Sequence, residues 1–155
     1  MKALIIVDVQ KGATKNKGLF KDKAFIETIN YTIERCRKSG NMVIFIQHNS
    51  KHYAYGAREW EIDNRINRKS TDKIIQKYHG NAFDKTDLKQ FLRQNGIDEI
   101  LVCGLVSHGC VLATCMGGIK HGFKTHLLKG GHTNWHKNAE ELIASTENEL
   151  EQMGV

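Results

Sequence analysis

The sequence predicts an α/β protein with three layers, α/β/α, around a mainly parallel sheet of five or six strands. Short apolar runs alternate with segments of helical period along the whole chain. The apolar runs are continuous, which is typical of strands that helices cover on both faces. The 155 residues suit a single domain, 1–155, and contain no low-complexity tract or linker.

Five apolar segments are predicted to be buried strands. They are 2–7 (KALIIV), 42–47 (MVIFIQ), 72–77 (DKIIQK), 98–105 (DEILVCGL) and 124–130 (KTHLLKG). Each is short enough for a strand and is bounded by polar residues or glycine. Residues 48–70 have no clear period and predict a long loop, a kind of segment that is often functional.

Segments of helical period separate these strands. Between residues 22 and 39 the apolar positions recur three or four apart, and Gly40 ends the helix. Further helices are predicted at 85–96, 109–121 and 138–153. Strands that alternate with helices form right-handed βαβ units, so the expected topology is Rossmann-like and doubly wound.

Composition narrows the classes of partner. The chain has 23 basic and 17 acidic residues, and the lysines are scattered, so we expect no nucleic-acid partner. No apolar segment is long enough for a membrane span, and the first apolar run ends at Asp8, so we expect a cytoplasmic protein. The four cysteines include no CxxC pair and are predicted to be free thiols, three of them in apolar patterns.

Three reactive side chains are predicted to meet at one edge of the sheet. Asp8 follows the first strand, Lys77 ends the third, and Cys110 follows the fourth. Open α/β sheets bind ligands at the carboxyl ends of their strands, which predicts a site made of an acid, an amine and a thiol. Taken singly, each residue has an ordinary alternative: a turn residue, a solvated lysine and an inert core thiol.

The chemistry expected of this trio is acyl transfer to water through a thioester. Cys110 would lie near a helix N-terminus, which together with Lys77 is expected to lower the thiol pKa and make it reactive below pH 8. Asp8 would accept the thiol proton and return it to a leaving amine. Backbone N–H groups of the turn 105–110 could form an oxyanion hole.

Three segments of the chain also resemble a known family. "ALIIVDVQ", "QKYHGNAFDKTDL" and "CGLVSHGCVLAT" are similar to the signature blocks of the isochorismatase-like cysteine hydrolase superfamily, and "FIQHNS" and "GGHTNWHKNAEEL" extend the resemblance over nearly the whole chain. The resemblance implies that Asp8, Lys77 and Cys110 form the catalytic triad. It also implies a non-proline cis peptide at Leu105–Val106, with the N–H groups of Val106 and Cys110 in the oxyanion hole.

The chain departs from the family pattern in two places. Lys11-Gly12-Ala13 replaces an Asn-Asp-Phe, and the region after the second strand reads Gln47-His48-Asn49-Ser50, without the Asp-x-His to which the nicotinamidase branch binds a metal. We therefore expect the metal-free branch of the superfamily, with no metal and no cofactor. Two histidine pairs four residues apart could hold zinc instead, but no carboxylate joins them at ligand spacing. They are His48 with His52, and His132 with His136.

The expected activity is hydrolysis of a C–N bond in a small amide or carbamoyl compound by a homo-oligomer, either a dimer or a tetramer. One alternative is a nicotinamidase-like, metal-assisted amidase, and another is a non-catalytic small-molecule-binding protein. A Rossmann-like nucleotide-binding protein is disfavoured because no GxGxxG or P-loop follows the first strand. His108 could also compete with Asp8 as the base. The predicted substrate-binding residues are Gln10, His48, Trp60, Ser107 and His108.

Overall fold

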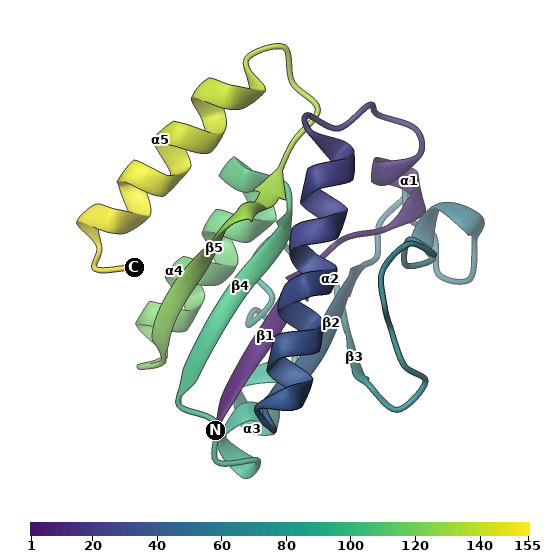
Figure 1. Ribbon diagram of the computed structural model, residues 1–155. Coiled ribbons are helices and arrows are strands. Elements are labelled where there is room, and N and C mark those ends of the chain that lie inside the picture. Colours follow the sequence, from purple (N-terminus) through teal and green to yellow (C-terminus); the bar gives the residue numbers. More distant parts are fainter.

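A five-stranded, all-parallel sheet forms the centre of the protein in the order β3-β2-β1-β4-β5 (Figure 1). The structure is a computed structural model and describes all 155 residues. The strands are β1 (Lys2–Val7), β2 (Met42–His48), β3 (Lys73–Lys77), β4 (Glu99–Leu105) and β5 (Lys124–Thr133). This confirms the predicted α/β class, with five strands.

Helices cover both faces of the sheet (Figure 1). They are α1 (Lys11–Thr14), α2 (Asp22–Lys38), the 3₁₀ turn η1 (Arg58–Trp60), α3 (Leu88–Gln94), the π turn η2 (Ser107–Val111), α4 (Leu112–Lys120) and α5 (Ala139–Gln152). Leu4 and Ile6 of β1 pack toward α2, whereas Ile5 and Val7 pack toward α3 and α4. Successive side chains of a strand point to opposite faces, so one apolar run supplies both cores. None of the helices has the length and apolar character that a membrane crossing requires.

Two predicted helices are shorter than expected. The helix predicted at 109–121 becomes regular only at Leu112, because Gly109 has non-helical angles (φ −113°, ψ −111°) and the preceding residues form η2. The helix predicted at 85–96 begins at Leu88, because Lys85 has a left-handed φ of +55°. The first interruption lies in the turn that directly follows β4 at the carboxyl edge of the sheet, and the second lies in the loop between β3 and α3.

Strand β5 runs past its predicted end through a bulge. Val102 pairs with Leu127 and Gly104 pairs with His132, so the single residue 103 of β4 faces residues 128–131 of β5. Gly130 permits the bulge with a φ of +78°. The bulge brings His132 back into register beside the carboxyl end of β4.

Gly104 brings the ends of β1 and β4 together. Its φ is +120°, and an added Cβ would lie 2.0 Å from the carbonyl oxygen of Val7. Only glycine fits this close approach. The chain builds outward from β1 to β3 and then crosses to β4, so the strand order reverses between β1 and β4. Ligands of doubly wound sheets bind at such a switch point.

Candidate active site

A buried ammonium group lies at the centre of the carboxyl edge. Lys77, the last residue of β3, is completely buried. Its Nζ lies 3.0 Å from Asp8 Oδ2, 2.7 Å from His48 Nδ1 and 3.3 Å from Cys110 Sγ. It also donates to the carbonyl oxygen of His79 at 3.0 Å. Burial of an unpaired charge is costly, so these contacts hold the ammonium in place and gather the three predicted residues around it.

Asp8 reaches this ammonium from a tight turn. It directly follows β1, has a φ of +55°, and donates its N–H to the carbonyl of Ile46 at 3.1 Å. The left-handed conformation is unfavourable for aspartate and is typical of functional positions. Oδ2 contacts Lys77, while Oδ1 is buried without a hydrogen-bond partner. Burial raises the pKa of Asp8, an effect that Lys77 only partly offsets. The carboxylate is therefore a base with one free acceptor atom.

The structure corrects the expected acidity of Cys110. Burial raises the pKa of this thiol most, and the negative charge of Asp8 raises it further, to about 11 in spite of Lys77. The expected net lowering of the pKa was wrong: Lys77 does lower it, but desolvation and the charge of Asp8 outweigh this effect. Reactivity below pH 8 stays a prediction. The raised pKa favours the protonated thiol, so a group that accepts its proton would promote formation of the nucleophilic thiolate.

The turn before Cys110 contains an unpaired backbone donor. The Leu105–Val106 peptide is cis, as the family resemblance implied. The carbonyl of Val106 accepts from the N–H groups of Gly109 and Val111 at 3.0 and 3.3 Å, whereas the Val106 N–H makes no backbone hydrogen bond. A free N–H close to a nucleophile can stabilise an oxyanion.

The comparisons with known proteins agree with this geometry. Residues 2–146 match the isochorismatase domain. The chain belongs to the isochorismatase family. The chain is 33% identical over 132 residues to YrdC of Bacillus subtilis, covering 82% of this chain and 71% of YrdC. It is 26% identical over 152 residues to YddQ of the same organism, covering 94% of this chain and 84% of YddQ.

More distant relatives include hydrolases and amidases. Streptothricin hydrolase of Streptomyces noursei is 25% identical over 150 residues, which cover 94% of this chain and 60% of that enzyme. N-carbamoylsarcosine amidase of an Arthrobacter species is 38% identical over only 64 residues, 41% of this chain and 24% of that enzyme. The activities in these names are those of the relatives.

Solved isochorismatase-family structures share the fold. The crystal structure of an isochorismatase family protein superposes with a TM-score of 0.89 at 25% identity, covering 95% of this chain and 91% of the other. A pyrazinamidase of Pyrococcus horikoshii in complex with zinc superposes with a TM-score of 0.84 at 22% identity, covering 97% and 94%.

Within this isochorismatase-family site, one group of side chains has metal-ligand spacing. Asp8, His48 and Cys110 each offer a ligand atom, and these atoms lie within 4.8 Å of one another. Lys77 Nζ, however, hydrogen-bonds or contacts all three. A metal ion would have to displace a completely buried ammonium that already supplies the positive charge. The trio therefore fits a metal ion poorly.

The predicted histidine pairs do not form a metal site. His52 is exposed, while His132 is buried and contacts Ser107 and Glu147. His48 Nδ1 accepts from Lys77, and burial together with the charge of Lys77 lowers the pKa of His48 to about 4. His48 is thus neutral near pH 7 and positions Lys77.

Gln10 and Trp60 have different surroundings from those expected of substrate ligands. Gln10 is completely buried, and its Nε2 donates to the carbonyls of His48 and Trp60 at 3.0 and 2.8 Å. Its Oε1 accepts from the His48 N–H at 2.9 Å, so each polar atom of the buried amide already has a protein partner. Trp60 Nε1 donates to Gln76 at 3.1 Å, and its ring packs on Tyr55. Both residues anchor the long loop to the sheet edge.

Ser107 and His108 differ in their exposure to the site. Ser107 is completely buried, with its Oγ 2.8 Å from His132 Nδ1. His108 is half-buried, its ring lies 4.9 Å from that of His136, and its Nδ1 has no hydrogen-bond partner. His136 thus adjoins the turn that carries the thiol, while His132 lies behind it.

Tyr53, in the loop without a clear period, is a residue of this site that was not predicted. Its ring packs against Gly12, where an added Cβ would lie 2.6 Å from Tyr53 Cε1, and meets the His48 ring edge-on at 6.1 Å. Burial raises the pKa of Tyr53, and the negative charge of Asp8 adds to the effect, as does that of Cys110 once its thiol is ionised. The phenol is therefore within electrostatic reach of the reactive pair. Gly12, which departs from the family pattern, was its only signal in the sequence.

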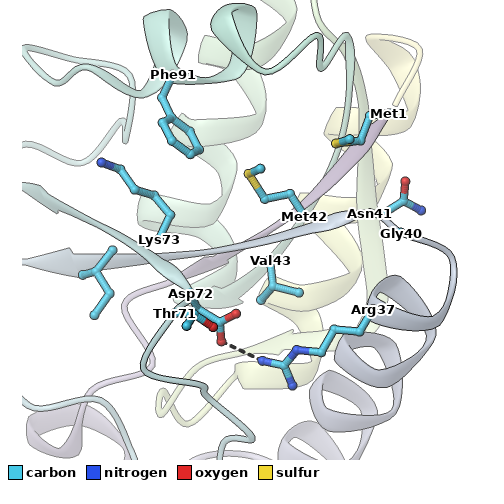
Figure 2. A pocket seen from close by; sticks show the side chains of 11 residues that line it. Met1, Arg37, Gly40, Asn41, Met42, Val43, Thr71, Asp72, Lys73 and Phe91 are labelled. Carbon is cyan, nitrogen blue, oxygen red and sulfur yellow. Dashed lines mark hydrogen bonds and ion pairs between the residues drawn. The ribbon is translucent and has the colours of Figure 1, made fainter.

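A separate cavity of about 570 Å³ lies at the opposite edge of the sheet. Figure 2 shows the starts of β2 and β3 in its wall, with Met42 and Lys73, and an ion pair of 2.6 Å between Arg37 and Asp72. The residues that line it include no cysteine or histidine, and Asp72 is held by Arg37. Asp8, Lys77 and Cys110 all lie outside this cavity.

Proposed function

We propose that this isochorismatase-family protein hydrolyses the C–N bond of a small amide or carbamoyl compound through a thioester on Cys110. The observation that carries the proposal is the position of Lys77 Nζ, 3.0 Å from Asp8 Oδ2 and 3.3 Å from Cys110 Sγ at the switch point of the sheet. The named amidase and hydrolase relatives support the class of substrate.

In the first half-reaction, Asp8 accepts the proton of the Cys110 thiol. This transfer leaves the total charge of Asp8, Lys77 and Cys110 at zero. The new thiolate is stabilised because it pairs with the Lys77 ammonium. Sulfur then attacks the substrate carbonyl carbon, and the N–H groups of Val106 and Cys110 stabilise the oxyanion. The C–N bond breaks as Asp8 returns the proton to the leaving nitrogen.

The second half-reaction releases the acid. Asp8 takes a proton from water, whose oxygen attacks the thioester carbon. The C–S bond breaks, and the proton passes from Asp8 to the sulfur, which restores the thiol. His108 and Tyr53 are the side chains that we assign to substrate contact, and Gln10, His48 and Trp60 hold the surrounding elements.

A screen of small amides and carbamoyl compounds for ammonia or amine release tests this function. We expect Cys110→Ala to abolish turnover of any substrate found, because no other group can form the thioester, and to keep the melting temperature. Cys36→Ala removes a half-exposed thiol on α2 and serves as the matched control with wild-type turnover. Turnover by the Cys110→Ala protein at near the wild-type rate would sink the mechanism.

We also propose that the reaction needs no metal, since Lys77 supplies the positive charge beside the thiol. Incubation with EDTA followed by desalting should leave the rate unchanged. The test is sharpest with the best substrate of the screen, assayed with and without added zinc. Loss of activity that zinc restores would instead favour a metal-assisted amidase, built on the spacing of Asp8, His48 and Cys110.

A further inference from the structure

Three side chains from three elements form a hydrogen-bonded chain behind the thiol-bearing turn. Ser107 Oγ of η2 lies 2.8 Å from His132 Nδ1 of β5. His132 Nε2 lies 3.0 Å from Glu147 Oε1 of α5. Ser107 is completely buried and His132 is 2% exposed, whereas the Glu147 side chain is 26% exposed. The proposed reaction uses none of these three groups.

The direction of the two hydrogen bonds follows from their chemistry. A carboxylate only accepts hydrogen bonds, so His132 Nε2 carries the hydrogen that it shares with Glu147. In a neutral imidazole Nδ1 then bears a lone pair, and the Ser107 hydroxyl must donate to it. Burial lowers the pKa of His132 although Glu147 opposes the effect, which agrees with a neutral ring.

The two distances between Ser107, His132 and Glu147 are those of a Ser–His–acid hydrolase triad. The complete burial of Ser107, however, does not suit a triad. A nucleophilic serine must reach its substrate, and Ser107 has no exposed surface. The hydroxyl is also committed as a donor to His132. The chain of hydrogen bonds can therefore act only through the backbone that Ser107 belongs to.

The same stretch of backbone contains the two groups that the proposed reaction uses to stabilise the oxyanion. They are the N–H groups of Val106 and Cys110. Ser107 directly follows Val106, whose N–H is free, and lies three residues before Cys110. On the other side, the bulge of β5 sets His132 opposite Gly104. The hydrogen bonds thus connect α5 to the turn at its point of attachment to β4.

We propose that His132 and Glu147 are positioning residues that hold the turn 106–110 through Ser107 and so control the rate of acyl transfer to Cys110. The inference rests on the proposed function and deepens it. Oxyanion donors act only when they are preorganised, and a displacement of about 1 Å at a reacting group can cost about 100-fold in rate.

The test uses p-nitrophenyl acetate as the probe. The Cys110 sulfur takes the acetyl group, p-nitrophenolate leaves, and Asp8 takes the thiol proton. Release of p-nitrophenolate would be followed in His132→Ala, Glu147→Gln, Ser107→Ala and the Ser107→Ala/His132→Ala double variant. Glu149→Gln, which removes the same charge from an exposed position of α5, is the matched control, and Cys110→Ala gives the background.

We expect His132→Ala and Glu147→Gln to lower the acylation kcat by about 10- to 100-fold with little change in KM. Glu149→Gln should stay within about twofold of wild type. Ser107 and His132 belong to one chain of hydrogen bonds, so their effects should not add. The acylation kcat of the double variant should therefore be no lower than that of the slower single variant. Melting temperatures close to wild type would show that the effect lies in the turn and not in folding.

Two results would overturn the inference. Wild-type rates in both His132→Ala and Glu147→Gln would remove the positioning role and leave the proposed function intact. A rise in KM that accounts for the whole loss would assign the residues to binding. If His132→Ala does not fold, the partly exposed Glu147→Gln decides. Absence of Cys110-dependent acylation in the wild type would instead contradict the proposed function itself.

Discussion

At the scale of single residues, Asp8 has two opposite effects on Cys110. Its negative charge raises the thiol pKa, and its free Oδ1 is the acceptor that the thiol proton needs. An enzyme with this arrangement keeps its thiol protonated until Asp8 takes the proton. In the proposed mechanism, the same residue therefore suppresses the unassisted reactivity of Cys110 and enables its catalysis.

This duality predicts that the Asp8→Asn variant changes two rates in opposite directions. Turnover should fall by about 10²- to 10⁴-fold, because the general base is lost. Alkylation of Cys110 by iodoacetamide at pH 8 should become faster, because removal of the negative charge lowers the thiol pKa. The alkylation rate would be measured against pH in a Cys36→Ala background. Slower alkylation in Asp8→Asn than in the parent would show that Asp8 does not oppose thiolate formation.

At the scale of elements, Arg65 fastens the long loop between β2 and β3 to α2. Its guanidinium contacts Asp22 at the start of α2 at 2.6 Å and Asp63 in the loop at 2.8 Å. Burial opposes ionisation of Asp63, but the hydrogen bonds from Arg65 prevail and lower the pKa of Asp63 to about 2. The loop that Arg65 fastens also carries Tyr53 and Trp60, so the ion pairs contribute to the wall of the site.

We predict that Arg65→Met lowers the free energy of unfolding by about 3 kcal/mol at pH 7, because it leaves the buried Asp63 carboxylate with only the more distant Lys15, at 4.0 Å, as a cationic partner. Asp63 has a folded pKa below its ordinary value of 3.8, so its stabilisation is complete above about pH 4 and is lost as the pH falls toward 2. The gap between wild type and variant should therefore narrow at pH 3, as measured by urea unfolding.

A matched control for this prediction is Lys23→Met, which breaks an exposed pair with Glu27 on α2. Exposed pairs contribute less than about 1 kcal/mol, so this variant should unfold close to wild type at both pH values. A pH-independent gap for Arg65→Met would show that the variant loses packing and not the ion pair with Asp63.

At the scale of the whole molecule, the strand order determines which residues can meet. Placing β1 between β2 and β4 brings the ends of strands that are distant in sequence to one edge, with β3 and β5 on the outside. Residues 8, 77 and 110 meet only because of this order. We propose that residues 1–155 act as one domain around this edge.

The expectation of a homo-oligomer is also tested at this scale. The outer strands β3 and β5 each have one side that no strand of this chain pairs with, and a second copy is one way to cover such edges. Sedimentation equilibrium should give a mass of two or four 17.6 kDa chains. A single species with the mass of one chain at micromolar concentration would contradict the expectation.

The sequence alone was sufficient for the fold class and for the meeting of Asp8, Lys77 and Cys110. Continuous apolar runs identify buried parallel strands, and the ends of parallel strands share an edge, so residues at those ends converge whatever the details of packing. The family resemblance extended this reasoning to the turn at Val106, whose cis peptide the structure contains. These features depend on local patterns that can be read along the chain.

Only the tertiary structure decided how these residues behave. The pKa of Cys110 depends on desolvation and on the balance between Asp8 and Lys77, neither of which has a signature in the sequence. Gln10 proved to be a buried clamp because a loop folds over it, and Ser107 faces His132 because a bulge in β5 shifts the register. Such contacts join residues far apart in the chain, and they form only when distant segments pack together, because burial and proximity are properties of the whole fold.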